Sequence, residues 1–166
     1  MMVNMIRNNI LFFCFFLGWN ILPAQSTYLN ETAKEMPTFQ KHYLYPSILR
    51  AIGGQDGSPM KDMVQDLKYV RILRIDSTYI VEHKFELSAV EDHLLSEGYE
   101  FMGSMYEKKS KSELYTIEKQ GEIEGFIAFI NEENSSLIIE IVGSIKVSKL
   151  SDLMNMDYGV FNMFLD

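Results

Sequence analysis

The sequence predicts an α+β fold, a two-layer sandwich in which a mostly antiparallel sheet of about five strands carries helices on one face. Two observations predict this class. The last four strand-like segments are joined by short polar turns, which favours an antiparallel meander. A helix-like segment separates them from an earlier strand-like segment, and this spacing permits a parallel crossover. No internal repeat, low-complexity tract or second domain interrupts the chain.

The chain opens with the features of an export signal. An apolar run from Ile10 to Trp19 is shorter than the roughly 20 residues of a membrane-spanning helix. Arg7 precedes the run, and the segment Ala24-Gln25-Ser26 follows it, as in a secretory signal peptide. We therefore expect residues 1–26 to be removed by cleavage after Ser26, with cleavage after Ala24 as the alternative.

Loss of this segment also removes the only cysteine. Cys14 lies inside the apolar run and follows Phe13, so it does not have the surroundings of a lipobox cysteine, and a lipid anchor is not expected. Removing residues 1–26 leaves 140 of the 166 residues, which is one domain of ordinary size. The mature chain is expected to form no disulfide and to offer no thiolate to zinc or to catalysis.

The balance of charge is acidic. The formal net charge is −8, and it becomes −9 when Arg7 leaves with the signal. An acidic chain repels nucleic-acid phosphates and anionic lipids, so neither is expected as a partner. We expect an exported protein that is periplasmic, or else at the cell surface or secreted, with no membrane span after signal removal.

The mature chain is expected to begin with an N-terminal arm over residues 27–41, which are polar, followed by a single α+β domain over residues 42–166. His42–Ile52 is apolar enough for a short helix, with Pro46 near its start.

Three further segments precede the main helix. The glycine-rich stretch at 53–59, GGQDGSP, indicates a turn, and residues 59–67 follow it as a second short helix. Residues 69–75, YVRILRI, are rich in β-branched and aromatic residues and predict a strand.

The clearest helix spans Glu86–Glu97. Leu87, Val90 and Leu94 recur at helical spacing on one side, and Gly98 stands where a helix C-cap glycine is expected. A strand over residues 99–107 follows.

The rest of the chain predicts three strands, a helix and a docked apolar tail. The strands cover Leu114–Lys119, Ile123–Ile130 and Leu137–Ile145, the helix covers Lys146–Met154, and turns fall at 108–112, 120–122 and 131–135. Tyr115 and Ile117 share one face of their strand. The next two strands are apolar on both faces, so they are expected at the centre of the sheet.

Three histidines, His42, His83 and His93, are candidates for a metal or acid–base site. His93 lies beside Glu91 and Asp92 and shares a predicted helix face with Glu86 and Glu97, so it could belong to a metal or acid–base site. A solvated helix face explains the same pattern and is preferred. His42 and His83 have no partner at zinc-ligand spacing.

Other candidates have an ordinary structural explanation. The loop Gly53–Ser58 has neither a phosphate-loop nor a dinucleotide fingerprint. Gly143-Ser144 lacks the pattern of a nucleophile elbow. Glu122 and Glu124 share a strand face and are interpreted as solvated, as are the lysines at positions 108, 109 and 111. No catalytic, cofactor-binding or metal-binding residue is assigned, and no cofactor is expected.

Four stretches carry a family resemblance: YVRILRI, LLSEGYEFMGSMYE, YTIEKQGEIEGFIAFINEE and LIIEIVGSIKVSKLSDL. They lie between about residues 69 and 150. Their order resembles a family of small exported Bacteroidetes proteins described only as domain of unknown function 4252. The resemblance implies an envelope location and supplies no reaction and no catalytic residue. Some relatives begin with a lipobox, from which this chain departs.

The expected function is that of a non-enzymatic envelope domain that binds another envelope protein or polypeptide, because an open sheet can accept a partner strand or helix. The alternative is a periplasmic small-molecule or cation binder that uses the acidic surface. A hydrolase that uses His93 with a carboxylate is a third hypothesis. The oligomeric state is not predicted.

Overall fold

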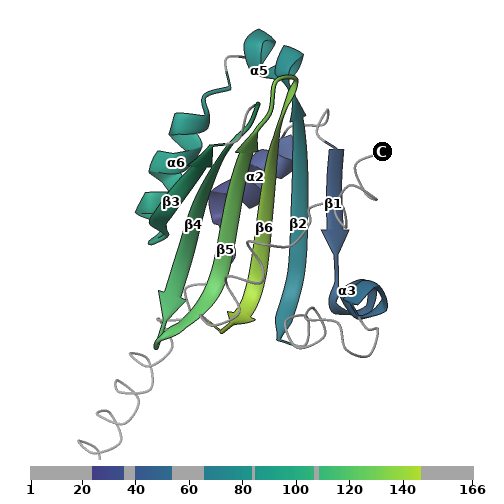
Figure 1. Ribbon diagram of the computed structural model, residues 1–166, viewed down its shortest axis with the longest axis vertical. Coiled ribbons are helices and arrows are strands. Elements are labelled where there is room, and N and C mark those ends of the chain that lie inside the picture. Colours follow the sequence, from purple (N-terminus) through teal and green to yellow (C-terminus); the bar gives the residue numbers. More distant parts are fainter. Residues whose placement is uncertain (1–23, 36–39, 54–65, 84, 107–108, 147–166) are drawn as a thin grey trace, which may run out of the picture.

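A six-stranded antiparallel sheet forms the centre of the protein (Figure 1). The computed structural model describes residues 24–35, 40–53, 66–83, 85–106 and 109–146. The strands are β1 (Gln40–Leu44), β2 (Leu67–Asp76), β3 (Glu100–Tyr106), β4 (Lys111–Lys119), β5 (Glu122–Asn131) and β6 (Ser135–Ile145). The helices are α2 (Thr27–Glu35), α3 (Pro46–Gly53), α5 (Ser77–His83) and α6 (Leu87–Ser96). The strand order is β1-β2-β6-β5-β4-β3. The α+β class is confirmed.

The sheet has one strand more than predicted, because β1 adds an edge strand beside β2. The helix expected over His42–Ile52 begins only at Pro46, and its first three residues belong to β1. Proline fits the first turn of a helix and fixes this boundary. Strand pairing with β2 therefore overrides the helical composition of the residues before Pro46.

The segment expected as an N-terminal arm contains helix α2, over Thr27–Glu35. Its buried side chains are Leu29, Thr32 and Ala33, which recur at spacings of three and four residues. Only one of them is large and apolar, so the sequence carries little amphipathic signal. Packing against the sheet stabilises this helix, as it does most short helices.

The meander of β3, β4, β5 and β6 is confirmed, and β5 and β6 lie inside the sheet as expected. The turn between β4 and β5 places Gln120 at φ 55° and Gly121 at φ 84°. Positive φ at both central residues is the requirement of the two-residue hairpin turn that matches strand twist.

Helix α6 is confirmed in the position predicted for it. Val90 and Leu94 are fully buried. Gly98 has φ +91°, its N–H donates to the Leu95 carbonyl, and the Tyr99 N–H donates to the Leu94 carbonyl. This pair of bonds is the Schellman motif, which ends the helix and turns the chain into β3.

The connection from β2 to β3 is a long crossover. These two strands run in the same direction, as the alternating antiparallel pairings require, but three other strands lie between them. Helices α5 and α6 occupy the crossover (Figure 1). The predicted parallel crossover is therefore present, although α5 was not anticipated.

Both faces of the sheet bear buried apolar side chains. One cluster joins α2 and α6 to the sheet, with Leu29, Ala33, Val90 and Leu94 packed against residues such as Leu73, Ile75, Ile127 and Ile138. The other cluster contains Leu49 of α3 together with Val70, Ile72, Phe126 and Ile139. The expected placement of all helices on one face is thus not confirmed for α3.

Several predicted elements fall on residues that the structure does not describe. They are most of the turn at 53–59, most of the helix at 59–67, and the helix and tail after Lys146. Leu67, the last residue of that predicted helix, instead opens β2. Within the described ranges, no helix has the length and apolar character needed to cross a bilayer.

Candidate functional site

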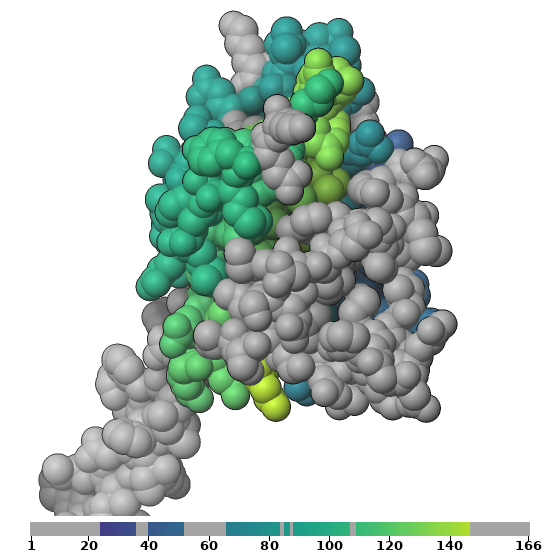
Figure 2. All heavy atoms as spheres, viewed as in Figure 1, coloured from purple at the N-terminus to yellow at the C-terminus, as the bar shows by residue number. Residues whose placement is uncertain are grey.

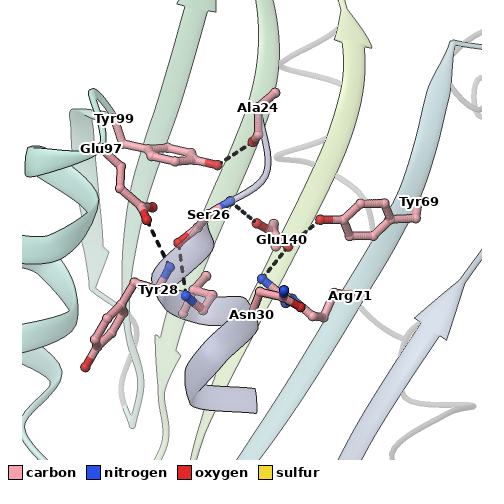
Figure 3. Close-up of polar contacts among 10 residues, drawn as sticks. Ala24, Ser26, Tyr28, Asn30, Tyr69, Arg71, Glu97, Tyr99 and Glu140 are labelled. Atoms are coloured by element: carbon pink, nitrogen blue, oxygen red, sulfur yellow. Dashed lines mark hydrogen bonds and ion pairs between the residues drawn. The ribbon is translucent and has the colours of Figure 1, made fainter. Parts of the chain in front are cut away.

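A buried ion pair lies at the centre of the face that α2 covers (Figure 3). Arg71 of β2 and Glu140 of β6 are directly opposite each other in the sheet register. The distance from Arg71 Nη2 to Glu140 Oε2 is 2.7 Å, and both side chains are 0% exposed. This distance makes the contact a buried ion pair.

Glu140 also accepts two hydrogen bonds. The Ser26 backbone N–H donates to its Oε1 at 2.9 Å, and the Tyr69 hydroxyl donates to its Oε2 at 3.0 Å. Burial raises the pKa of the Glu140 carboxyl, against the opposing effects of Arg71 and of the two donors. Burial, and then the nearby Glu140 carboxylate, raise the pKa of the Tyr69 hydroxyl.

The Arg71 guanidinium has fewer hydrogen-bond partners for its donors than the Glu140 carboxylate has for its oxygens. Arg71 Nη1 lies 3.5 Å from Asn30 Oδ1 of α2, a long contact for a hydrogen bond. Its buried Nε has no hydrogen-bond partner among the described residues. A guanidinium with buried unpaired donors is costly to bury, so the carboxylate opposite it is the group that makes its burial tolerable.

A second set of contacts joins Ala24 and the first turn of α2 to Glu97 and Tyr99, at the junction of α6 and β3. The Tyr99 hydroxyl donates to the Ala24 carbonyl at 2.6 Å, and the Tyr28 N–H donates to Glu97 Oε1 at 2.9 Å (Figure 3). Gly125 of β5 leaves room for this approach, since a Cβ there would lie 2.8 Å from the Ala24 oxygen. Burial is the main cause that raises the pKa of the Tyr99 hydroxyl.

These buried groups contact one another. Glu140 receives the N-terminal end of α2 through Ser26, and the positive end of a helix dipole favours a carboxylate in that place. The cluster therefore holds α2 against the sheet. It is a structural site that positions the N-terminal helix.

The edge strand β3 presents a different kind of surface. It is the last strand of the sheet and pairs only with β4 among the described residues. Three of its large apolar side chains are exposed: Phe101 at 50%, Met102 at 47% and Tyr106 at 73%. Leu95 of the neighbouring helix α6 is 46% exposed. In the space-filling view, α6, β3 and β4 form the left side of the body (Figure 2).

A β-bulge shapes this edge. The register shifts between Phe101, opposite Tyr115, and Gly103, opposite Leu114, so Met102 is the extra residue. The regular alternation of side chains along a β-strand therefore fails at Met102. As a result, the neighbouring side chains of Phe101 and Met102 are both exposed.

Hollows in the described part of the molecule include two at the sheet. One of about 520 Å³ is bordered by Arg74, Lys109, Ser110 and the β5–β6 hairpin residues Glu132, Glu133, Asn134 and Ser135. The other, of about 250 Å³, lies between α6 and the sheet and is lined by residues that include Glu91, Lys111, Glu113 and Tyr115. Lys111 and Glu113 pair with each other at 2.6 Å. Charged and polar residues make up most of the lining of each hollow.

The histidines are dispersed over the structure. His93 is exposed on α6 and stacks on the Tyr28 ring, with ring centroids 4.0 Å apart. His83 stacks on Tyr79 and contacts that residue's carbonyl oxygen through Nδ1 at 3.2 Å. His42 lies in β1, opposite Ile72. His93 thus has the exposed position expected of a solvated helix face.

Two other candidates, Glu122 and Ser144, form a hydrogen bond with each other at the surface. The Ser144 hydroxyl donates to Glu122 Oε2 at 2.6 Å, and Glu122 is exposed. Lys109 pairs with Glu133 on the surface at 2.9 Å. The loop 54–58 and Lys108 lie outside the described residues. In the described ranges, no three His, Cys, Asp or Glu side chains gather so as to hold a metal ion.

The sequence interpretation missed Arg71 and Glu140. Arg71 is one of two arginines in the strand YVRILRI, and Glu140 is the charged residue inside the apolar run LIIEIV. A carboxylate in a strand predicted to be buried on both faces was the signal that could have found Glu140 and the need for a cation beside it. The exposed edge could not be found in this way, because the strand order was not known.

Comparison with known proteins gives one match. The family model described as "Domain of unknown function (DUF4252)" matches residues 31–153, which is most of the chain and includes all six strands. No curated protein and no solved structure matches. The match covers the four stretches in which the sequence resembled this family and confirms that resemblance. The chain belongs to the DUF4252 family of domains of unknown function.

Proposed function

We propose that this protein is an exported, non-enzymatic domain that binds an extended segment of another envelope polypeptide along the outer edge of β3. The observation that carries the proposal is the combination of a sheet edge to which no described strand pairs with three exposed large apolar side chains. An added strand would pair with the outer backbone N–H and C=O groups of β3 and would cover Phe101, Met102 and Tyr106.

Comparison of the two edges of the sheet supports the choice of β3. Natural edge strands are usually short, or are protected by charges, especially lysine, or by proline. β1, QKHYL, is five residues long and carries Lys41. β3, EFMGSMY, is seven residues long and carries only Glu100 at its start. The bulge at Met102 protects part of this edge. Beyond it, residues 103–106 pair regularly with β4 and leave an outer edge at which a further strand can pair.

The faces of the sheet are less suitable. Side chains from both faces belong to buried clusters, so a partner helix on either face would have to displace existing packing. The interaction surface is therefore proposed at the edge of the sheet and not on one of its faces. The net charge, −8 for the full chain and −9 once Arg7 leaves with the signal, favours a partner segment that is apolar with neutral or basic residues, because an acidic one would be repelled.

Export is supported by the N-terminal sequence. A positive residue, a short apolar run and a small residue after it are the parts of a secretory signal. An envelope location would place the domain among polypeptides that arrive there unfolded, and such chains can supply an extended strand.

Site-specific photo-crosslinking in cells tests the proposal. A photoreactive residue replaces Tyr106 on β3 or, as the control, Val81 on α5, which is similarly exposed at 77%. We expect a discrete crosslinked envelope protein from position 106 only. Met102→Lys should abolish this product, because a cation in the apolar contact is costly, whereas Val81→Lys should preserve it.

Three results would contradict the proposal. They are equal crosslinking from both positions, a product that Met102→Lys leaves unchanged, and a product made of two copies of this chain. The last result would show that β3 pairs with a second copy of this chain in a homodimer.

The alternative function is a small-molecule or cation binder. The 520 Å³ hollow beside the β5–β6 hairpin is the place that favours it, since Glu132, Glu133 and Asn134 bring oxygen atoms there. A rise in the thermal unfolding midpoint with millimolar calcium, lost in Glu132→Gln, would support this alternative. The same rise in the variant would refute a site at the hairpin.

A further inference from the structure

Two peptide bonds near the start of the chain fit the end of an export signal, one after Ala24 and one after Ser26. The two cuts differ by only two residues. They have different consequences for the folded domain, because Ser26 belongs to the buried cluster around Glu140.

Ser26 has three roles in the folded domain. Its hydroxyl accepts a hydrogen bond from the Leu29 N–H at 3.1 Å, so it is the N-cap of α2. Its carbonyl accepts the first helical hydrogen bond, from the Asn30 N–H at 3.2 Å. Its own N–H donates to Glu140 Oε1 at 2.9 Å, and the residue is 0% exposed. An ordinary linker residue makes no such contacts.

A cut after Ser26 would remove all three. Helix α2 would begin with a charged ammonium on Thr27, at the end of the helix where positive charge is unfavourable. The Leu29 N–H would lose its cap. Glu140 would keep Arg71 and Tyr69 but would lose the donor to its Oε1.

A cut after Ala24 preserves them. Ser26 keeps its amide N–H, because its bond to Gln25 remains. Ala24 and Ser26 are both small enough to stand before a signal-peptidase cut, so the sequence allows either bond and the contacts of Ser26 decide between them. The contact that is lost is the bond from the Tyr99 hydroxyl to the Ala24 carbonyl.

The surroundings of Ala24 can receive the new terminus. The nitrogen of Gln25 is bonded to the Ala24 carbonyl carbon, so it lies less than about 2.6 Å from the oxygen that the Tyr99 hydroxyl contacts. Gln25 also precedes Ser26, whose N–H donates to the buried Glu140 carboxylate (Figure 3). An ammonium group at Gln25 would therefore lie one residue from a carboxylate contact.

We propose that an envelope signal peptidase cuts this chain between Ala24 and Gln25, and that the mature domain keeps Ser26 as the cap of α2 and as a ligand of Glu140. The reaction is an amide hydrolysis. Water adds its oxygen to the Ala24 carbonyl carbon, the bond to Gln25 breaks, and the products are a carboxylate on Ala24 and an ammonium on Gln25. This inference rests on the proposed export.

The mature terminus can be read directly. The full chain, with a C-terminal tag, is expressed in a bacterium with a general export pathway and purified from the envelope fraction, and the mass of its N-terminal peptide is measured. A start at Gln25 is expected. A start at Thr27 or elsewhere overturns this inference and leaves export standing. An uncut chain in the cytoplasm overturns both.

A stability comparison tests the structural reason. Chains that begin at Gln25 and at Thr27 are released from a fusion partner without extra residues, and their unfolding in urea is followed. The Gln25 chain should have a folding equilibrium constant at least about tenfold larger, because it keeps a cap and a buried hydrogen bond. Ser26→Ala in the Gln25 chain should remove part of this advantage, whereas Thr27→Ala, at the exposed next position, should not. Equal stability of the two chains would overturn the reasoning.

Discussion

Replacing Arg71 by methionine tests the buried ion pair that joins β2 to β6. Methionine has a similar length but carries no charge and donates no hydrogen bond. In the variant, Glu140 keeps only the Ser26 N–H and the Tyr69 hydroxyl as donors. Its carboxylate, 0% exposed, then has no positive charge at 2.7 Å. Breaking a buried pair in this way costs about 3–5 kcal/mol of unfolding free energy, since it leaves an uncompensated charge.

The assay is equilibrium unfolding in urea at pH 7.5, with thermal unfolding beside it. For a chain of this size each kcal/mol lowers the unfolding midpoint by about 2–4 °C, so a drop of roughly 10 °C is expected. Lys109→Met is the matched control. It breaks the Lys109–Glu133 pair, whose side chains are 79% and 66% exposed, and an exposed pair contributes at most about 1 kcal/mol.

The double variant Arg71→Met/Glu140→Leu separates lost charge pairing from lost packing. Removing both charges leaves two apolar side chains in an apolar sheet, which is often neutral or stabilising. The Ser26 N–H and the Tyr69 hydroxyl lose their acceptor, which costs less than a buried unpaired charge. We expect the double variant to be more stable than Arg71→Met alone. An Arg71→Met protein within about 1 kcal/mol of the unmodified one, or a double variant no better than the single, would refute the reasoning.

The loss in Arg71→Met should also depend on pH. The pKa of Glu140 is already raised by burial, and removing the cation raises it further. The folded state then binds the proton more tightly than the unfolded state, so unfolding free energy falls as pH rises above the ordinary value of 4.5 toward the raised pKa. The deficit of the variant should therefore be smaller at pH 5 than at pH 8, and a deficit independent of pH would contradict this.

Two further predictions concern the close backbone approach at Gly143 and the Asp76 carboxylate at the start of α5. Gly143→Ala should destabilise the fold by about 2 kcal/mol or more, because Gly143 has φ +144° and a Cβ there would lie 2.4–2.9 Å from the backbone of residues 66–68. Gly103→Ala, with no atom within 4 Å of its Cβ, is the control and should change urea unfolding little. Asp76 accepts hydrogen bonds from the Thr78 N–H and hydroxyl, which hold the pKa of its carboxyl below the ordinary 3.8. This contribution is present above pH 3.8 and is lost as pH falls through the lowered pKa. The protection of α5 amides, relative to the intrinsic exchange rate at each pH, should therefore fall there, and the same fall in Asp76→Ala would contradict this.

The sequence was informative wherever local chemistry decides the structure. Helix α6 follows from the spacing of Val90 and Leu94, and its end follows from Gly98, which can take the positive φ that the cap requires. The β4–β5 hairpin follows from Gln120-Gly121 in the same way. The apolar runs of β5 and β6 placed these strands inside the sheet, because a strand that is buried on both faces has no polar side to show.

Tertiary structure decided the features that depend on distant partners. α2 and β1 exist because the sheet offers them packing and pairing, while their own residues give a weak pattern. The pairing of Arg71 with Glu140 joins residues 69 positions apart, and no local signal fixes which strands become neighbours. The same holds for β3, which is exposed because the crossover from β2 carries it past three strands to the edge. The residues alone therefore determined the elements with a strong local pattern, namely α6 and the strands β2 to β6. The strand order, a property of long-range pairing, determined α2, β1, the buried cluster and the edge position of β3.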